Sequence, residues 1–222
     1  MSLFPQHQDL LKVKLKQFLA LTSLNPSNNW SKSVIKDSLS IHTHKDSKGV
    51  MMIRSEGSIP CPIEQVFSIF WSDVEALKKV DTSVAGYEIL ESSKDDTQII
   101  VHNILKAQPL VTPRDMVMIM AHVKEKSRYI VYGSSIKYPE EKGYIRAECN
   151  VWGWIFNEDE ANKGRTWAIN VNYTDLGGMI PSFVVKPVLI KEHGYLIKRV
   201  SSNTPTPINK KIPLKSSINA KL

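Results

Sequence analysis

Hydrophobic and polar residues alternate most regularly near the C-terminal end of the chain, between residues 166 and 173. One side of the alternation is Trp167, Ile169, Val171 and Tyr173, and the other is Thr166, Ala168, Asn170 and Asn172. A period of two predicts a half-buried strand. The segment 183–190 that follows is apolar nearly all the way round, which is not the pattern of a surface helix. A helix there must be covered on most sides, or must itself cover something apolar.

Similar patterns divide the rest of the chain into helices and strands. Residues 8–22 predict an amphipathic helix, because Leu11, Leu15 and Phe18 follow helical spacing. Two shorter helices are expected at 62–71, with a proline near the first position, and at 72–79, which opens with a capping signature. Strands are predicted within 30–59 (two, joined by a hairpin at 45–49) and at 87–90, 97–105, 114–125, 129–136 and 144–156.

This order of elements predicts an α+β fold. Hairpin-connected strands can form one curved antiparallel β-sheet, and the long C-terminal helix can then lie across its concave side. Residues 1–200 are expected to form one domain, since no linker interrupts them. Residues 201–222 contain three prolines, four lysines and no acidic residue, so we expect a disordered basic tail.

Composition and charge narrow the function only slightly. The 222 residues are 42% hydrophobic and 23% charged, as in an ordinary globular protein, and the net charge of +7 is compatible with an anionic membrane surface. Nucleic acid is not an expected partner, because no cluster of lysine and arginine is interleaved with aromatic residues. The sequence shows neither a membrane span nor a signal peptide, so a soluble cytoplasmic protein is expected.

Residues with catalytic or metal-binding chemistry are few. Cys61 and Cys149 lie in apolar or strand-like sequence, which favours buried reduced thiols but leaves one disulfide open. His42 and His44 share a strand face without a third ligand, so we expect a surface pair and no metal. No nucleophile-elbow, paired-cysteine or phosphate-loop motif is present. We therefore expect neither enzymatic activity nor a cofactor other than a bound ligand.

Four short motifs match one family in order and spacing. They are GSIP at 57–60, PRDMV at 113–117, YIRA at 144–147 and DLGGMIP at 175–181. Together they make residues 8–200 resemble the START (steroidogenic-acute-regulatory-related lipid transfer) domain. The chain departs from the family at Val80, where a tryptophan is frequent, and at Pro187, which interrupts the last helix.

The resemblance implies a helix-grip fold, in which the sheet curls around the C-terminal helix and leaves a tunnel for one lipid. It also implies a gate formed by the loop 107–113 and the segment 179–188. Both segments are apolar, although a plain surface would not require this. The residues expected to form the gate and touch a membrane are Pro109, Leu110, Val111, Met179 and Ile180.

The strand that starts at Arg114 presents Met116, Met118 and Met120 on the same face as the arginine. Flexible methionines suit a surface that adapts to a lipid chain, although simple core packing would give the same pattern. Comparison with the family favours this face as the tunnel lining. In sterol-type members of the family a buried acid and base pair inside the tunnel, and their positions correspond to Asn103 and Met120 here. Because that pair is absent, a phospholipid of the phosphatidylcholine type is preferred over a sterol.

A phospholipid requires a partner for its phosphate and aromatic groups for a choline-like cation. Arg114 is the candidate for the phosphate, with a structural salt bridge as the alternative. Tyr132, Trp167 and Tyr173 are the candidate aromatic neighbours, with core packing as the alternative. The full set of expected lipid-binding residues is Asn103, Leu105, Arg114, Met116, Met118, Met120, Tyr132, Trp167, Tyr173, Phe183, Val184 and Val188.

These observations predict a non-enzymatic protein that binds a phospholipid or sterol and transfers it between membranes, docking transiently on their surfaces. Two alternatives remain open. One is a lipid-sensing or scaffold module that binds lipid without moving it, and the other is an enzyme built on the helix-grip fold.

Overall fold

The computed structural model describes residues 4–25, 28–36, 39–180 and 182–203. Within these residues the strands form a single ten-stranded sheet in the order β1-β2-β3-β10-β9-β7-β6-β5-β4, and β8 pairs with β6 off this path. All neighbours along the path are antiparallel, whereas β8 runs parallel to β6. The predicted α+β class with a curved antiparallel sheet and C-terminal helical segments is confirmed.

The strands are β1 (Ser31–Lys36), β2 (Leu39–Lys45), β3 (Met51–Ile59), β4 (Val84–Ser92), β5 (Gln98–Leu105), β6 (Arg114–Lys124), β7 (Arg128–Ser135), β8 (Ile145–Arg146), β9 (Glu148–Glu158) and β10 (Thr166–Asp175). The helices are the 3₁₀ turn η1 (Pro5–His7), α1 (Gln8–Thr22), α2 (Ile63–Trp71), α3 (Val74–Val80), α4 (Ser182–Leu189), the π-helical segment η3 (Ile190–Gly194) and α5 (Leu196–Asn203).

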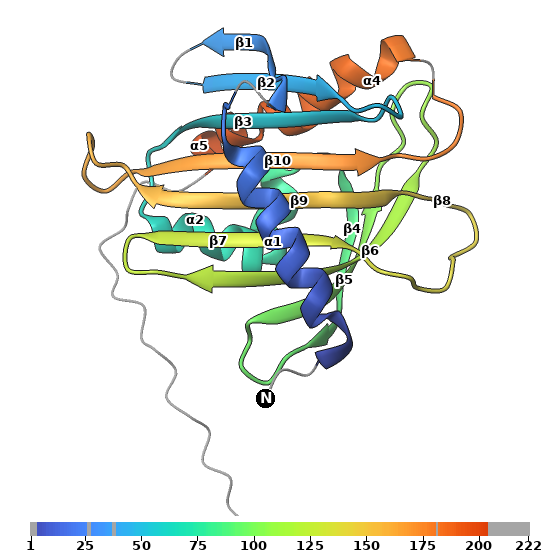
Figure 1. The fold of residues 1–222 in the computed structure, drawn as a ribbon, viewed down its shortest axis with the longest axis horizontal. Helices are drawn as coiled ribbons and strands as arrows, with labels where there is room; N and C mark the ends of the chain where they lie inside the picture. The colour runs from blue at the N-terminus through green and yellow to red at the C-terminus, as the bar shows by residue number, and fades with distance from the viewer. Residues whose placement is uncertain (1–3, 26–27, 37–38, 181, 204–222) are drawn as a thin grey trace, which may run out of the picture.

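Helices cover both faces of the sheet. Figure 1 shows α1 crossing the face toward the viewer, here called the outer face, while α2 and α5 lie behind the sheet on its inner face. On the outer face Phe18 of α1 packs with Val117, Val151 and Val171. A side chain at Gly153 would place its Cβ 2.8 Å from the Phe18 ring, so glycine at this position lets α1 approach β9 closely. The inner face carries the larger hydrophobic core, which includes residues of α2, α3, α4 and α5.

The predicted hairpin at 45–49 is confirmed, and Asp46 organises it. Its carboxylate accepts the backbone N–H groups of Lys48 at 2.9 Å and of Val50 at 2.8 Å. The region 30–59 nevertheless contains three strands and not two, because β1 adds to β2 at the edge of the sheet. The predicted strand 144–156 is also divided, since Ala147 separates β8 from β9 and donates its N–H to the Asp115 carbonyl at 2.8 Å.

The C-terminal helix is not continuous, which corrects the expectation of one long helix. Pro187 has no N–H to donate inside α4. A wider π-helical turn then follows the end of α4 directly. Gly194 ends this turn where a Cβ would meet side-chain atoms of Ile41 and Ile53 at 3.0–3.2 Å. The helix therefore consists of two α-helical halves with a junction that packs closely on β2 and β3.

Cys61 and Cys149 are both buried, and no disulfide joins them. Among the described residues no helix has the length and apolar character needed to cross a membrane. Of the tail predicted at 201–222, the first three residues are the end of α5, which corrects its expected start, and residues 204–222 lie outside the described residues.

Candidate functional site: a cavity under the C-terminal helix

A cavity lies between the inner face of the sheet and the helices that cover it. The volume open to the centre of a water-sized molecule is about 50 Å³. Ligand pockets usually measure about 300–1,000 Å³, so the walls must separate before a large ligand can enter. The lining residues are Phe70, Leu77, Asp81, Val84, Tyr87, Val101, Asn103, Leu105, Met116, Met118, Met120, Cys149, Trp152, Asn172, Thr174, Leu176, Leu189 and His193.

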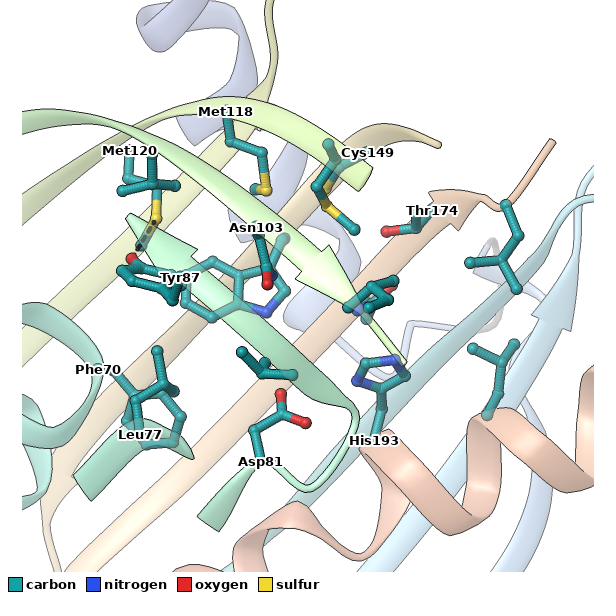
Figure 2. Close-up of a pocket in the computed structure, with 18 residues that line it drawn as sticks. Phe70, Leu77, Asp81, Tyr87, Asn103, Met118, Met120, Cys149, Thr174 and His193 are labelled. Atoms are coloured by element: carbon teal, nitrogen blue, oxygen red, sulfur yellow. Dashed lines mark hydrogen bonds between the residues drawn. The ribbon is translucent and has the colours of Figure 1, made fainter. Parts of the chain in front are cut away.

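Strands β5 and β6 form the wall that the sequence analysis predicted. Met116, Met118 and Met120 all line the cavity, and Figure 2 shows the last two above Asn103 and Tyr87. Asn103 and Leu105 join them because β5 pairs with β6 in antiparallel register, with Asn103 opposite Met116. Alternation along a strand fixes this arrangement, since residues two apart must point to the same face.

Polar side chains enter the same cavity from other elements. Asn172 and Thr174 come from β10, Asp81 follows α3, and His193 belongs to η3. Figure 2 shows Asp81 and His193 rising toward Asn103 from opposite Met118. Among all the polar residues of the lining, the sequence analysis had named only Asn103 as lipid-binding. The alternation of Asn170, Asn172 and Thr174 along β10 was the signal that could have located two more.

The electrostatic character of the cavity follows from burial. Burial lowers the pKa of His193 below its ordinary value, because an imidazolium ion would lose its hydration there. Burial also raises the pKa of the Tyr87 phenol, and raises the pKa of the Cys149 thiol to about 12. The Asp81 carboxyl group accepts hydrogen bonds from the Ser83 backbone N–H at 3.1 Å and hydroxyl at 2.6 Å. Lysine and arginine are absent from the described lining.

Arg114 lies outside the lining and joins two loops at one end of the cavity, here called the gate end. Its guanidinium donates to the carbonyl oxygens of Leu176 at 3.2 Å and Gly177 at 3.3 Å. It also donates to the carbonyl and hydroxyl oxygens of Thr112, the hydroxyl at 2.9 Å. The side chain is buried, and its hydrogen-bond partners among the described residues are these oxygens. Arg114 therefore ties the loop 107–113 to the segment before α4.

The two segments that Arg114 joins, together with the first turn of α4, expose apolar side chains to solvent. The exposed fraction is 70% for Leu110, 100% for Met179 and 73% for Phe183. Pro109 is also exposed, whereas Val111 is buried and Ile180 is half-buried. Leu110 has a φ of 65°, a backbone conformation that costs a leucine on the order of 1–2 kcal/mol.

Comparison with known proteins identifies the family. The START domain family matches residues 11–203. The chain belongs to this family. Human StAR-related lipid transfer protein 5 superposes on the START domain described here with a TM-score of 0.79 at 17% identity, covering 90% of this chain and 97% of that one. Human STARD10 superposes with a TM-score of 0.73 at 15% identity, covering 85% of this chain and 77% of that one. These two likenesses establish the fold alone.

Sequence relatives of this START domain include the mitochondrial steroidogenic acute regulatory protein. The horse protein is 27% identical over 169 residues, and the human protein is 27% identical over 165 residues. The alignments cover 70% and 68% of this chain but only 57% and 56% of the relatives. The chain therefore spans little more than half the length of the proteins that it resembles.

Three aromatic residues expected beside the ligand lie elsewhere in this START domain, and their predicted position is wrong. Tyr132 and Tyr173 pack on the outer face with α1, where the Tyr173 hydroxyl donates to Asp46. Trp167 lies on the same face of β10 as Tyr173 and is half-buried opposite Asn157. The apolar side of β10 faces α1, so the cavity receives the polar side of this strand, including Asn172.

Arg114 was also expected to bind a lipid phosphate, but its guanidinium already donates hydrogen bonds to carbonyl oxygens. On α4, Phe183 is exposed, and neither Val184 nor Val188 is part of the lining, which this region reaches through Leu189. From the C-terminal helix the described lining therefore includes Leu189 and His193, and not the two valines.

Among the described residues one group has the spacing for a metal ion, formed by His102, Asp115 and Glu141. Its central carboxylate is already engaged, because Arg146 donates to both oxygens of Asp115 at 2.9 and 2.8 Å. His102 approaches the same carboxylate at 3.0 Å. None of the three residues lines the cavity, and the group serves to brace β5, β6 and β8.

Proposed function

We propose that this START domain binds one lipid in the cavity beneath its C-terminal helix and transfers it between membranes. The lining supports this function, since methionine, leucine, valine and aromatic side chains form most of its surface. Methionine side chains adapt easily to the shape of an apolar ligand. Human StAR-related lipid transfer protein 5, which shares the fold, carries lipid transfer in its name.

The energetics of transfer favour control by opening of the cavity. Removing an acyl chain from water is worth about 0.8 kcal/mol per methylene, which gives on the order of 10 kcal/mol for a chain of roughly 16 carbons. Leaving a bilayer costs a similar amount, so exchange between the two apolar environments is nearly balanced. The rate then depends on how often the narrow cavity widens at a membrane surface.

The observation that carries the proposal is the apolar surface at the gate end. Leu110, Met179 and Phe183 are exposed on the two segments that Arg114 ties together and on the first turn of α4, beside the cavity. Leu110 is held in an unfavourable backbone conformation at the tip of its loop, although asparagine or glycine would fit there with less strain. Exposed apolar groups of this kind mark an interaction surface, and an apolar membrane interior is the complementary partner. Lys106, directly before the loop 107–113, and Lys186 of α4 are also exposed and would favour anionic lipid.

The test is the movement of labelled lipid between donor and acceptor vesicles, with sterol and phosphatidylcholine measured separately. Wild-type protein should accelerate transfer of at least one of them. Leu110→Asp should slow transfer about tenfold or more, because the loop can no longer enter the bilayer, while the unfolding midpoint stays unchanged. Asp also tolerates the left-handed conformation at this position.

Val13→Asp is the matched control, because Val13 is an exposed apolar residue of α1, on the opposite face of the sheet from the cavity. It should leave transfer unchanged. If wild-type protein retains a lipid but exchanges none, the domain is a lipid-sensing module and not a transfer protein. If both variants slow transfer equally, the gate end is not the docking surface.

A further inference from the structure

We infer that the cavity selects an uncharged lipid, and that a hydroxyl group of this lipid donates hydrogen bonds to side-chain oxygens near the gate end. This inference rests on the proposed function and narrows it to one chemical class. It also replaces the phosphatidylcholine preference drawn from the sequence. Asn103, Asn172 and Thr174 are the residues that would recognise the donor.

The observation behind the inference is a set of buried polar atoms without adequate partners. The Oδ1 atoms of Asn103 and Asn172 are buried and have no hydrogen-bond partner among the described residues, and Asn172 as a whole is only 6% exposed. Within the described part of the chain, the one hydrogen-bonding group shown for the Thr174 hydroxyl is the Cys149 thiol, which is a weak one. All three side chains line the same cavity from two strands.

On β10 itself, polar side chains outside the cavity form hydrogen bonds, although Ser55 Oγ on the neighbouring β3 has no partner among the described residues. Asn170 precedes Asn172 by two positions on β10 and donates its side-chain N–H to the Gly153 carbonyl at 2.9 Å. The Thr166 hydroxyl donates to the Cys61 carbonyl at 2.7 Å. The unsatisfied oxygens on this strand are therefore confined to the part that faces the cavity, and they do not reflect a general property of β10.

A buried oxygen without a partner destabilises a protein unless water or a ligand supplies the missing hydrogen bond. The small volume of the cavity is enough for a few water molecules, which can bridge such oxygens when no lipid is present. A lipid that displaces this water must supply donors of its own, or it loses affinity. A hydroxyl group meets this requirement, and an ester or ether oxygen does not.

The charge of the lining excludes a phosphate group from the same position. Arginine and lysine are absent from the described lining, and the guanidinium of Arg114 is directed to carbonyl oxygens. Asp81 adds an acidic group to the wall. An anion moved out of water into such a site has no opposite charge to offset its lost hydration.

The strand register places these oxygens nearer the gate end than the interior. Asn103 lies opposite Met116, two residues from the start of β6, and Thr174 precedes Leu176 by two residues. The interior end is formed by Phe70, Leu77 and Met120, which offer mainly apolar surface. The lipid would therefore enter with its apolar body first and keep its hydroxyl near the gate.

The experiment measures binding of four lipids to the full chain, arranged in two pairs that differ mainly in the polar group. Cholesterol is compared with its 3-O-methyl ether, and dioleoylglycerol with dioleoylphosphatidylcholine. At least one hydroxyl lipid should bind about tenfold or more tightly than its partner. The pair that shows this preference identifies a sterol or a diacylglycerol as the source of the hydroxyl.

Two variants then assign the preference to residues. Thr174→Val and Asn172→Leu should each reduce the ratio of affinities within that pair severalfold, because they remove the acceptor and leave the cavity shape nearly unchanged. Thr43→Val makes the same chemical change at a buried threonine outside the lining, whose hydroxyl lies 2.9 Å from Ser33 Oγ, and should leave the ratio unchanged. Unfolding midpoints confirm that each variant is folded.

Equal binding within both pairs would overturn the inference and leave lipid transfer intact. Phosphatidylcholine binding that exceeds diacylglycerol binding would overturn it as well. Failure of the wild-type chain to bind any of the four lipids would overturn the proposed function itself.

Discussion

The two halves of the C-terminal helix differ sharply in how they are held. In α5, Leu196, Ile197 and Val200 are all buried against the inner core. In α4, Leu189 is the buried apolar residue, while Phe183 is exposed and Pro187 interrupts the hydrogen bonding. The same helix thus contains one half that belongs to the core and one half that rests on it.

An arginine reinforces each half, but with different partners. Arg199 of α5 donates to the carbonyl oxygens of Val80 at 2.8 Å, Lys191 at 2.7 Å and Glu192. It therefore anchors α5 and the π-helical segment to α3. Arg114 ties only loops to one another at the other end. We infer that opening for a lipid moves α4 and the loops while α5 stays in place.

The largest expected difference between the halves is in global stability. Leu196→Ala should lower the free energy of unfolding by about 2–5 kcal/mol, because it leaves a cavity in a packed core. Phe183→Ala should change it by less than about 0.5 kcal/mol, since the side chain is exposed. Urea unfolding measures both values. Equal losses would show that α4 is as much a part of the core as α5.

Replacing each arginine by lysine separates anchoring from gating. Arg199→Lys should lower the free energy of unfolding by about 1–3 kcal/mol, because one ammonium cannot reproduce the spread of guanidinium contacts. Arg114→Lys should instead increase amide hydrogen exchange in 107–113 and 176–180, with a smaller change in the unfolding midpoint, since opening there is local.

Hydrogen exchange of the unliganded wild-type protein provides the baseline, in which α4 should exchange faster than α5. Equal protection of α4 and α5 from hydrogen exchange would contradict the inference that α4 moves while α5 stays in place.

The smallest expected effect concerns the junction between the halves. His193 faces Asp81, Glu192 and Arg199, and burial lowers its pKa in the folded protein. Below about pH 6.5 the unfolded chain therefore binds more protons at this position, so stability falls as the pH drops. The slope is at most about 1.4 kcal/mol per pH unit for one group.

His193→Gln should reduce this slope in urea titrations between pH 7.5 and 5.5. The remaining slope belongs to groups such as His42 and His122, whose pKa values burial also lowers. An unchanged slope would show that the junction does not respond to pH.

Periodicity along the strands predicted one wall of the cavity because pairing fixes side-chain direction. Once β5 and β6 pair, Asn103 and the methionines must face the same way, and the sequence shows which residues share that face. Periodicity alone does not show which face of a strand is inside. Both faces of β10 are covered by other parts of the protein, the apolar one only in part, and the apolar side was assigned to the cavity although it packs against α1.

Features formed by tertiary contact were less accessible to sequence reasoning. Asp81 and His193 reach the cavity from a loop and from the π-helical segment, where no local repeat indicates direction. The apolar run 183–190 predicted a helix correctly, but the α-helix ends at Leu189 and a π-helical segment follows it. That segment ends at Gly194, where a Cβ would lie only 3.0–3.2 Å from side-chain atoms of β2 and β3. Helix propensity along the sequence carries no information about such contacts with distant strands.

The alkylation rates of the two cysteines can report on two different motions of the protein. Only a thiolate reacts readily with electrophiles, and burial raises the pKa of Cys149 on the cavity wall to about 12. A small neutral reagent should therefore alkylate Cys149 only when the cavity opens far enough to admit the reagent and to hydrate the thiolate. Cys61, buried in the core just before α2, should react only when that part of the core unfolds. The ratio of the two alkylation rates in one sample would compare how often the cavity opens with how often the domain unfolds.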